Sequence, residues 1–239
     1  MRKIILALAG LGLALTSASP AWSAKPSAKA APAATGSKRA KPAPARPAET
    51  PPLPVSPDAE RVAAWIAASA DNGGLPYAIV DKKSASLLLF DAGGKPLGHV
   101  PVLLGIALGD DASPGIGTKN LSEIGPAEKT TPAGRFLARF GVAAGNQRVL
   151  WVDYANSVAL HPIPRPGKPR ERRRERMLSP TGTDNRITFG CINVPLAFYT
   201  GTISPLFRRK GGYVYVTPDE KPLEDVFPRI RIQSFGSPG

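Results

Sequence analysis

A proline-rich segment near the N-terminus limits which part of this chain can fold. Residues 25–57 contain nine Pro and nine Ala, and their apolar residues do not recur at helical or strand spacing. A stretch of this kind cannot bury a core and is expected to stay extended and solvated. Of the 239 residues, those from about residue 57 onward therefore remain for one folded domain of ordinary size.

The residues before this segment have the pattern of a targeting signal. Arg2 and Lys3 precede an apolar run over residues 4–15, and small residues follow it. This order is typical of a secretory signal peptide, here residues 1–24; an uncleaved membrane anchor is the alternative. We therefore expect a disordered tether at residues 25–56 and a folded domain at 57–239. The chain would then cross the inner membrane and work in the periplasm or at the cell wall.

The positive charge of the chain is concentrated in a few segments. The formal net charge is +13, of which the signal carries two, the tether five and the run from Arg165 to Arg176 another five, which leaves +1 for the rest. Neither the tether nor this run contains an aromatic residue. A nucleic-acid-binding domain usually has a basic face across its body, so we expect no nucleic-acid partner. The basic segments suit an anionic wall or membrane surface, or are merely solvated.

Short apolar runs separated by turn residues predict a mainly β domain with few helices, a mixed β fold. Ser56 and Pro57 supply the cap and first residue of a helix that ends at residues 71–74. A second helix is expected between Asn193 and Lys210, opened by Pro195. Strands are expected at residues 77–80, 86–90, 99–104, 136–140, 149–154, 157–160 and 213–217. Residues 105–134, rich in Gly, form a long loop that predicts a lid or binding loop, or an unstructured surface insertion.

The content of Cys and His excludes several classes of protein. One Cys cannot form a disulfide framework, and one Cys with two His cannot form a typical zinc site. We therefore expect no metal and no cofactor. Of the two imidazoles, His99 follows Gly98 in an expected strand and is interpreted as structural, which leaves His161 as the candidate base.

The surroundings of Cys191 favour a reactive thiol over a small buried apolar residue. Gly190 allows a tight turn before Cys191, and the expected helix follows. Amides at a helix N-terminus lower a thiol pKa and can stabilise an oxyanion. A thiol with an ordinary pKa of about 8.5 also needs a base at neutral pH.

Four separated sequence elements resemble the L,D-transpeptidase catalytic domain, the YkuD-like family. His161-Pro162 followed by Thr188-Phe189-Gly190-Cys191-Ile192-Asn193 is similar to its signature of a His, a gap, then Ser or Thr, His, Gly, Cys, an apolar residue and Asn or Arg. Residues 131–136 resemble its T-P-x-G-x-F element, and residues 79–90 with 101–102 resemble its opening hairpin. The resemblance covers about residues 77–217 and implies a mixed β-sandwich.

The resemblance also implies roles for individual residues. Cys191 would be the nucleophile and His161 the general base, oriented by the carbonyl of Pro162. Backbone amides of Gly190 and Cys191 would form the oxyanion hole, while Thr188 and Asn193 shape the site. The family attacks a peptidoglycan stem peptide, expels a terminal D-amino acid, and passes the resulting thioester to an amine of a second stem. Such chemistry would serve cell-wall organisation and cell shape.

The chain departs from this family pattern at two places. Phe189 replaces the second His of the signature, and 26 residues separate His161 from Thr188, more than the family's usual gap. The second departure predicts an added loop next to the site, in which the second half of the run from Arg165 to Arg176 is expected to form one or two helical turns. Arg186 is a candidate for binding a substrate carboxylate or, equally, for a structural ion pair.

The sequence is also compatible with two other functions. Hydrolysis of the thioester would give an L,D-carboxypeptidase or amidase, and a non-catalytic cell-wall-binding protein is the alternative from a different class. We expect the protein to act as a monomer on peptidoglycan stem peptides.

Overall fold

The computed structural model describes residues 53–165 and 167–233, which all belong to a unit spanning residues 50–239. The predicted signal peptide and nearly all of the predicted tether lie outside the described residues. No helix within the described ranges has both the length and the apolar character needed to cross a membrane.

The helix predicted after the tether is α1, Pro57–Ser69, and its N-terminus is fastened to the sheet. The hydroxyl of Ser56 accepts a hydrogen bond from the amide of Ala59 at 3.3 Å, as a capping residue does. The amide and hydroxyl of Ser56 also donate to the carboxylate of Asp81, at 2.7 and 2.9 Å. Ser56 therefore both begins α1 and ties it to the end of the first strand.

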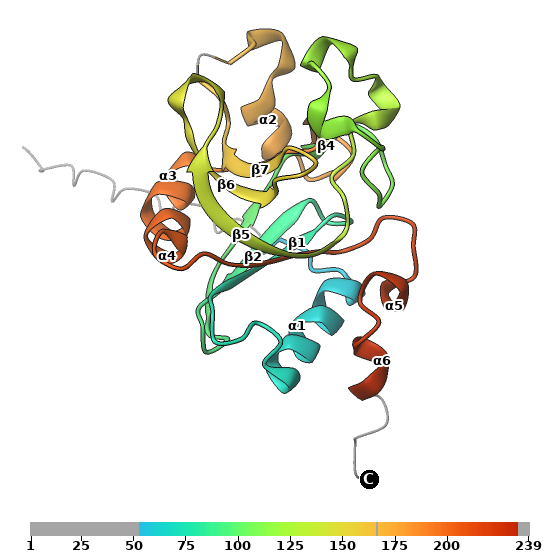
Figure 1. Ribbon diagram of the computed structural model, residues 1–239, viewed down its shortest axis with the longest axis vertical. Helices are drawn as coiled ribbons and strands as arrows, with labels where there is room; N and C mark the ends of the chain where they lie inside the picture. Colours follow the sequence, from blue (N-terminus) through green and yellow to red (C-terminus); the bar gives the residue numbers. More distant parts are fainter. Residues whose placement is uncertain (1–52, 166, 234–239) are drawn as a thin grey trace, which may run out of the picture. The chain divides into compact units, whose positions relative to one another are not determined.

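Eight strands form one mixed sheet (Figure 1), in the order β3-β2-β1-β10-β5-β6-β7-β9. Neighbouring strands run antiparallel except for β1 with β10 and β7 with β9, which are parallel. The strands of this sheet are β1 Tyr77–Asp81, β2 Ser86–Phe90, β3 Pro96–Pro101, β5 Gly134–Val142, β6 Arg148–Asp153, β7 Val158–Pro162, β9 Ile192–Val194 and β10 Gly212–Val216. A separate parallel pair joins β4, Leu104–Gly105, to β8, Arg186–Thr188. The prediction of a mainly β domain with few helices is confirmed.

The strand predicted at residues 99–104 is wrong in its bounds. The chain pairs with β2 only as far as Pro101, after which the amide of Val102 donates to the carbonyl of Ala85 and that of Leu103 to Asn193. The segment therefore leaves the first ladder and continues as β4. Proline has no amide hydrogen to donate, which suits Pro101 to the end of a ladder.

Three short helices lie outside the two longer predicted ones, and only the first agrees with a prediction, that of one or two helical turns in the second half of the run from Arg165 to Arg176. They are α2 Arg173–Met177, α5 Leu223–Val226 and α6 Ile230–Gln233. Each has only four or five residues, too few for apolar periodicity to be recognised.

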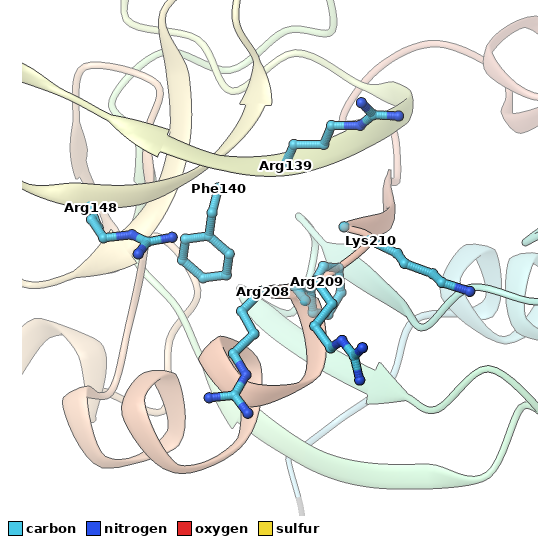
Figure 2. Close-up of a pocket in the computed structure, with 8 residues that line it drawn as sticks. Arg139, Phe140, Arg148, Arg208, Arg209 and Lys210 are labelled. Carbon is cyan, nitrogen blue, oxygen red and sulfur yellow. The ribbon is translucent and has the colours of Figure 1, made fainter.

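The second predicted helix is continuous in the chain but changes its winding. It consists of α3, Leu196–Phe198, a π-turn η6, Tyr199–Ile203, and α4, Ser204–Phe207. Tyr199, Ile203 and Phe207 are buried against the sheet, whereas Leu196 is exposed. Three basic residues, 208–210, follow α4 as predicted and lie near Arg139 and Phe140 in the middle of β5 (Figure 2).

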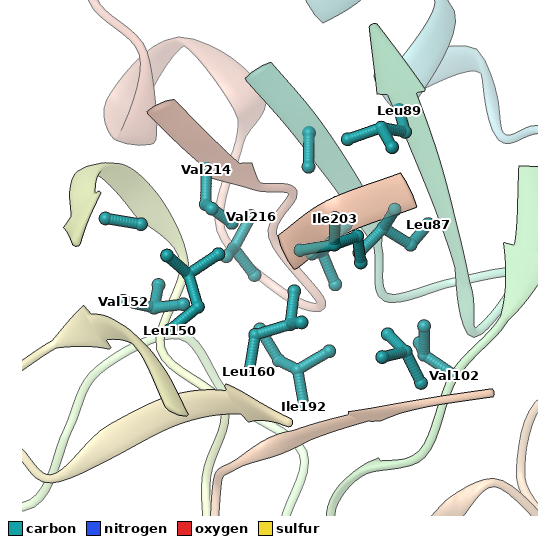
Figure 3. Packing of buried hydrophobic residues seen from close by; sticks show 14 of the residues in the cluster. Leu87, Leu89, Val102, Leu150, Val152, Leu160, Ile192, Ile203, Val214 and Val216 are labelled. Carbon is teal, nitrogen blue, oxygen red and sulfur yellow. The ribbon is translucent and has the colours of Figure 1, made fainter. Parts of the chain in front are cut away.

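The core consists of two clusters, one on each face of the central strands. Side chains alternate across a strand, so Ala78 and Val80 of β1 enter one cluster while Tyr77 and Ile79 enter the other. The first cluster lies between the sheet and the helix α3–α4 (Figure 3). The second lies beneath α1, where Trp65 meets Tyr215 edge-on, with ring centroids 6.0 Å apart. Because both faces are covered, β1 is buried along its whole length.

A buried ion cluster connects the start of the β1–β2 turn to distant loops. The ammonium of Lys82, which is fully buried, donates to Asp110 at 2.8 Å and lies 3.1 Å from Asp219. It also donates to the carbonyls of Gly109 and Thr131, at 2.7 and 3.0 Å. Burial alone would raise the pKa of Asp110, but hydrogen bonds from Lys82 and three backbone amides lower it to about 2. The cluster therefore holds the long loop and the C-terminal segment in place.

We expect Lys82→Met to destabilise the protein by about 3–5 kcal/mol, because it leaves two buried carboxylates without their shared cation. Lys83→Met is the matched control: Lys83 is exposed and pairs with Asp58, so its loss should cost less than about 1 kcal/mol. Urea unfolding of both variants measures the difference. Equal midpoints for the two would contradict the role of the buried cluster.

Candidate active site

The parallel pairing of β7 with β9 brings the two predicted catalytic residues to one end of the sheet. His161 lies directly opposite Asn193, and Cys191 is the residue that precedes β9. Two positions along a strand span about 6.6 Å and adjacent strands lie about 4.8 Å apart. The Cα atoms of Cys191 and His161 are therefore separated by one strand spacing and two residues, a distance that the two side chains can bridge.

The ring of His161 is held by its own strand. Nδ1 donates to the carbonyl of Pro162 at 2.7 Å, which directs Nε2 toward β9 and makes it the free acceptor. Nε2 lies 3.4 Å from the side-chain amide of Asn193. Burial is the main reason why the pKa of His161 is lowered; the hydrogen bond to Pro162 opposes this shift and the positive charge of Arg173 adds to it. At neutral pH the imidazole is therefore uncharged and able to accept a proton.

Cys191 is partly exposed, but protein surrounds its thiol. Sγ donates a weak hydrogen bond of 3.7 Å to the carbonyl of Ser157, and within the described ranges it makes none to His161. Burial raises the pKa of the thiol, while the amide of Ala159 and the charge of Arg173 lower it. The sequence-based expectation of a thiol activated at a helix N-terminus is wrong, because Cys191 leads into strand β9 and the helix begins only at Leu196. The resting pair is a neutral thiol and a neutral imidazole.

Thr188 fixes the turn that presents Cys191. Its hydroxyl donates to the carbonyl of Cys191 at 2.6 Å and accepts the amide of Gly190 at 3.2 Å. Gly190 has a φ of +127°, and a Cβ there would lie 2.6 Å from the carbonyl oxygen of Thr130, so only glycine fits. The predicted oxyanion hole is thus only half available: the Gly190 amide is engaged, whereas the Cys191 amide has no partner among the described residues.

The long loop predicted at residues 105–134 is ordered and lies against this turn. It contains three short 3₁₀ helices, η1 Ile116–Thr118, η2 Leu121–Glu123 and η3 Pro126–Glu128. The hydroxyl of Thr131 donates to the carbonyl of Gly190 and accepts the amide of Gly105, both at 2.9 Å. Of the two sequence-based interpretations, an unstructured insertion is wrong; a role as lid or binding loop stays a prediction.

Phe189, which stands where the family signature has its second His, contacts the same loop. The ammonium of Lys129 lies over its ring, 4.1 Å from the centroid. The residue therefore makes a cation–π contact that helps to hold the loop on the turn.

Arg173 is the residue that the sequence analysis missed. It is the first residue of α2, in the inserted segment, and its side chain is only 14% exposed. It donates to the side-chain oxygen of Asn193 at 2.7 Å and to Glu171 at 2.6 Å. A chain of contacts thus runs from Glu171 through Arg173 and Asn193 to Nε2 of His161. The charge and length of the insertion indicated a loop near the site, but nothing in a run of seven basic residues distinguishes this Arg from its neighbours.

Most of the other charged side chains of the inserted run form ion pairs or hydrogen bonds within the insertion or with residues close to it. Lys168 and Arg173 face Glu171, Arg172 pairs with Glu175, and Arg176 donates to the carbonyl of Asp184. Arg165, Arg170 and Arg174 are exposed and form no ion pair among the described residues.

The other candidate residues lie in structural contacts. Arg186 forms an ion pair with Asp219 at 2.5 Å and contacts the carbonyls of Gly105, Ala107 and Lys82. This is the structural alternative to substrate binding. His99 lies on β3, at the far end of the sheet order from β9, and its Nε2 is 2.8 Å from the hydroxyl of Ser86. No group of three or more Cys, His, Asp or Glu suited to a metal occurs in the described ranges.

Neither a protein-family model nor a curated protein sequence matches this chain. Solved structures show a distant likeness. An L,D-transpeptidase from Xylanimonas cellulosilytica is 13% identical, with a TM-score of 0.35, over 59% of this chain and 60% of that one. Bd1075 from Bdellovibrio bacteriovorus is 12% identical, with a TM-score of 0.37, over 66% and 54%. A mutant of Pgp2, a helical cell shape determining protein of Campylobacter jejuni, is 12% identical, with a TM-score of 0.41, over 75% and 66%.

This chain thus covers less than two thirds of the length of each of these proteins. With TM-scores below 0.5, the likeness assigns no role to any residue here.

We expect alkylation of Cys191 by iodoacetamide to titrate with an apparent pKa above the ordinary value of about 8.5, because burial disfavours the thiolate. Arg173→Gln should raise this apparent pKa further, since the guanidinium favours the thiolate. Arg174→Gln, at an exposed neighbouring position, should leave it unchanged. The pH dependence of the alkylation rate measures all three. A wild-type value below 8.5 would mean that the thiol is activated in the resting protein after all.

Proposed function

We propose that the protein is a peptidoglycan L,D-transpeptidase that forms cross-links through a thioester on Cys191. The observation that carries this proposal is the pairing of β7 with β9, because His161 lies on β7 and the one cysteine of the chain immediately precedes β9. The Nδ1 contact to Pro162 leaves Nε2 as the proton acceptor, as a general base requires. The sequence signature around His161 and Cys191 supports the choice of this reaction among those of cysteine enzymes.

The reaction would begin with a change at Cys191. Sγ turns from the Ser157 carbonyl toward Nε2, gives its proton to the imidazole, and attacks a stem-peptide carbonyl. The Cys191 amide is placed to donate to the oxyanion that forms. When the amide bond breaks, the imidazolium returns the proton to the leaving amine and the thioester remains. An amine of a second stem then attacks the thioester, its proton passes through His161, and the thiol is restored.

Arg173 would assist this sequence through Asn193. The amide of Asn193 faces the same Nε2 that must receive the thiol proton, and Arg173 holds the amide by its oxygen. With its oxygen bound to Arg173, the amide presents its NH₂ group to Nε2, which keeps the ring neutral and in one tautomer. The positive charge of Arg173 also lowers the pKa of Cys191 and so favours the thiolate that forms during attack.

The substrate and location follow from the same proposal. Stem peptides of peptidoglycan are the proposed partners, and the signal-like N-terminus suits a protein exported to the periplasm or the wall. The basic segments outside the core would favour an anionic wall or membrane surface and require no nucleic acid. The proposed chemistry needs neither metal nor cofactor.

A non-catalytic wall-binding protein is the second candidate, and two contacts favour it. The thiol donates its hydrogen bond to the carbonyl of Ser157 rather than to His161. The side-chain amide of Asn193 lies next to Nε2 of His161, where the thiol would have to approach. Loose contacts of this kind are also common in unliganded active sites and tighten when substrate binds. Hydrolysis of the thioester by water, giving a carboxypeptidase or amidase, differs only in the acceptor.

Incubation of the full chain with purified muropeptides distinguishes these functions. A cross-linked dimer that has lost one terminal residue, detected by mass spectrometry, is the expected product, together with a covalent adduct on Cys191. Cys191→Ala should abolish both, while His99→Gln, at a structural histidine, should leave turnover unchanged. Trimming without dimers would indicate a hydrolase. Binding without any change in the muropeptides would contradict an enzymatic function.

The pH profile tests the base. Because burial lowers the pKa of His161, the imidazole stays neutral as the pH falls below its ordinary value of about 6.5. We expect the acidic limb of kcat/KM to have its midpoint below pH 6.5, and Arg173→Gln to move that midpoint upward. Measurement with a soluble muropeptide at constant ionic strength checks both. A midpoint above 6.5 would show that another group limits the rate.

A further inference from the structure

A group of basic side chains surrounds a hollow between the β5–β6 ribbon and the end of α4 (Figure 2). We call this group the basic hollow; its cations are Arg139, Arg148, Arg208, Arg209 and Lys210. Phe140 and Phe207 form the apolar part of its lining, and its volume is about 410 Å³. All five cations are exposed. This group cannot be recognised from the sequence, because its members come from three separated stretches of the chain.

The charges of the basic hollow are not balanced by the protein. No acidic residue lines it, and within the described ranges none of its five cations forms an ion pair or a side-chain hydrogen bond to a carboxylate or carbonyl. Several exposed basic residues outside the hollow do form ion pairs: Arg61 pairs with Glu224, Arg229 with Asp71 and Arg231 with Asp225. A body whose remaining charge is near zero thus has a strongly positive face in one place.

The backbone conformation at Gly211 brings residues 208–210 close to β5. Gly211, with a φ of +74°, lies against β5, where an added Cβ would be 2.3 Å from the carbonyl oxygen of Ala138. The same Cβ would lie 3.0 Å from Cγ of Arg139, so the turn that carries residues 208–210 reaches the side chain of Arg139. On the other side, the guanidinium of Arg148 is 5.8 Å from the ring centroid of Phe140. Only glycine permits this approach at residue 211.

We propose that the basic hollow is a binding site for a phosphate-bearing polyanion. Four of its five cations are guanidinium groups, which bind phosphate oxygens with two parallel hydrogen bonds. A single carboxylate would occupy one of them and leave the others unpaired, whereas two or more linked phosphates can neutralise several at once. The volume of the hollow also exceeds that of a lone phosphate. The source of the phosphates is either a soluble oligophosphate or the headgroups of an anionic membrane.

The proposal is independent of the proposed enzymatic function. None of the residues that line the basic hollow belongs to the candidate active site, and the pairing of β7 with β9 does not involve them. Either proposal can therefore fail without the other.

Inorganic pyrophosphate is the probe for a soluble ligand and phosphatidylglycerol vesicles are the probe for a membrane, with phosphatidylcholine vesicles as the neutral control. The test variant combines Arg139→Gln, Arg208→Gln and Arg209→Gln. The matched control combines Arg165→Gln, Arg170→Gln and Arg174→Gln, which removes the same charge from exposed, unpaired positions of the insertion. Calorimetry of the full chain follows pyrophosphate, co-sedimentation follows the vesicles, and thermal melting verifies that each variant is folded.

We expect saturable binding of at least one anionic probe, weakened at least tenfold in the test variant. The matched control should weaken pyrophosphate binding less than threefold, and it should weaken vesicle binding less than the test variant does, because the inserted run is itself proposed to favour an anionic surface. Binding of pyrophosphate would identify a soluble ligand, and binding of phosphatidylglycerol vesicles alone would identify a membrane surface. Equal weakening in both triple variants would mean that only net charge matters and would overturn the site. Absence of binding to either probe at low salt would overturn it as well.

Discussion

The parallel register between β7 and β9 is the constraint on which the candidate site depends. It sets His161 against Asn193, and it places the turn with Cys191 at the start of β9 rather than at the end of a helix. A shift of one residue in this pairing would turn Asn193 and the side chains near it to the opposite face. The register is itself held from the other side, because Leu103 exchanges two backbone hydrogen bonds with Asn193. Asn193 is therefore held by β7 on one side, by the backbone of Leu103 on the other, and by Arg173 at its side chain.

Two segments from elsewhere in the chain contact the residues around Cys191. The residues between His161 and Thr188 bring the guanidinium of Arg173 to Asn193. Phe189 in turn holds Lys129 and with it the long loop. Cationic side chains from two other segments of the chain thus contact residues on either side of Cys191. The site is neutral at its centre and positively charged at its edge.

The sequence predicted the parts of the fold that depend on local pattern. The cap at Ser56, the strand at residues 77–80 and the helix after Pro195 depend on neighbouring residues, and each was found close to its expected position. The split of the strand at Pro101, the contact of Arg173 with Asn193 and the gathering of Arg139 with Arg208 depend on residues far apart in the chain. No local pattern can specify such contacts. Cys191 and His161 were recognisable because the chain offers one thiol and two imidazoles, but the state of the thiol depends on the surrounding packing.

The attachment of Ser56 to Asp81 has a mechanical consequence. Any tension applied through the residues that precede Ser56 reaches the domain first at the two hydrogen bonds between Ser56 and the carboxylate of Asp81. Asp81 ends a strand that is hydrogen-bonded on both sides and buried on both faces, so the load passes directly into the centre of the sheet. Helix α1, which follows Ser56 in the chain, is bypassed by this path. A protein pulled by the residues before Ser56 would lose this anchor before it lost the register between β7 and β9.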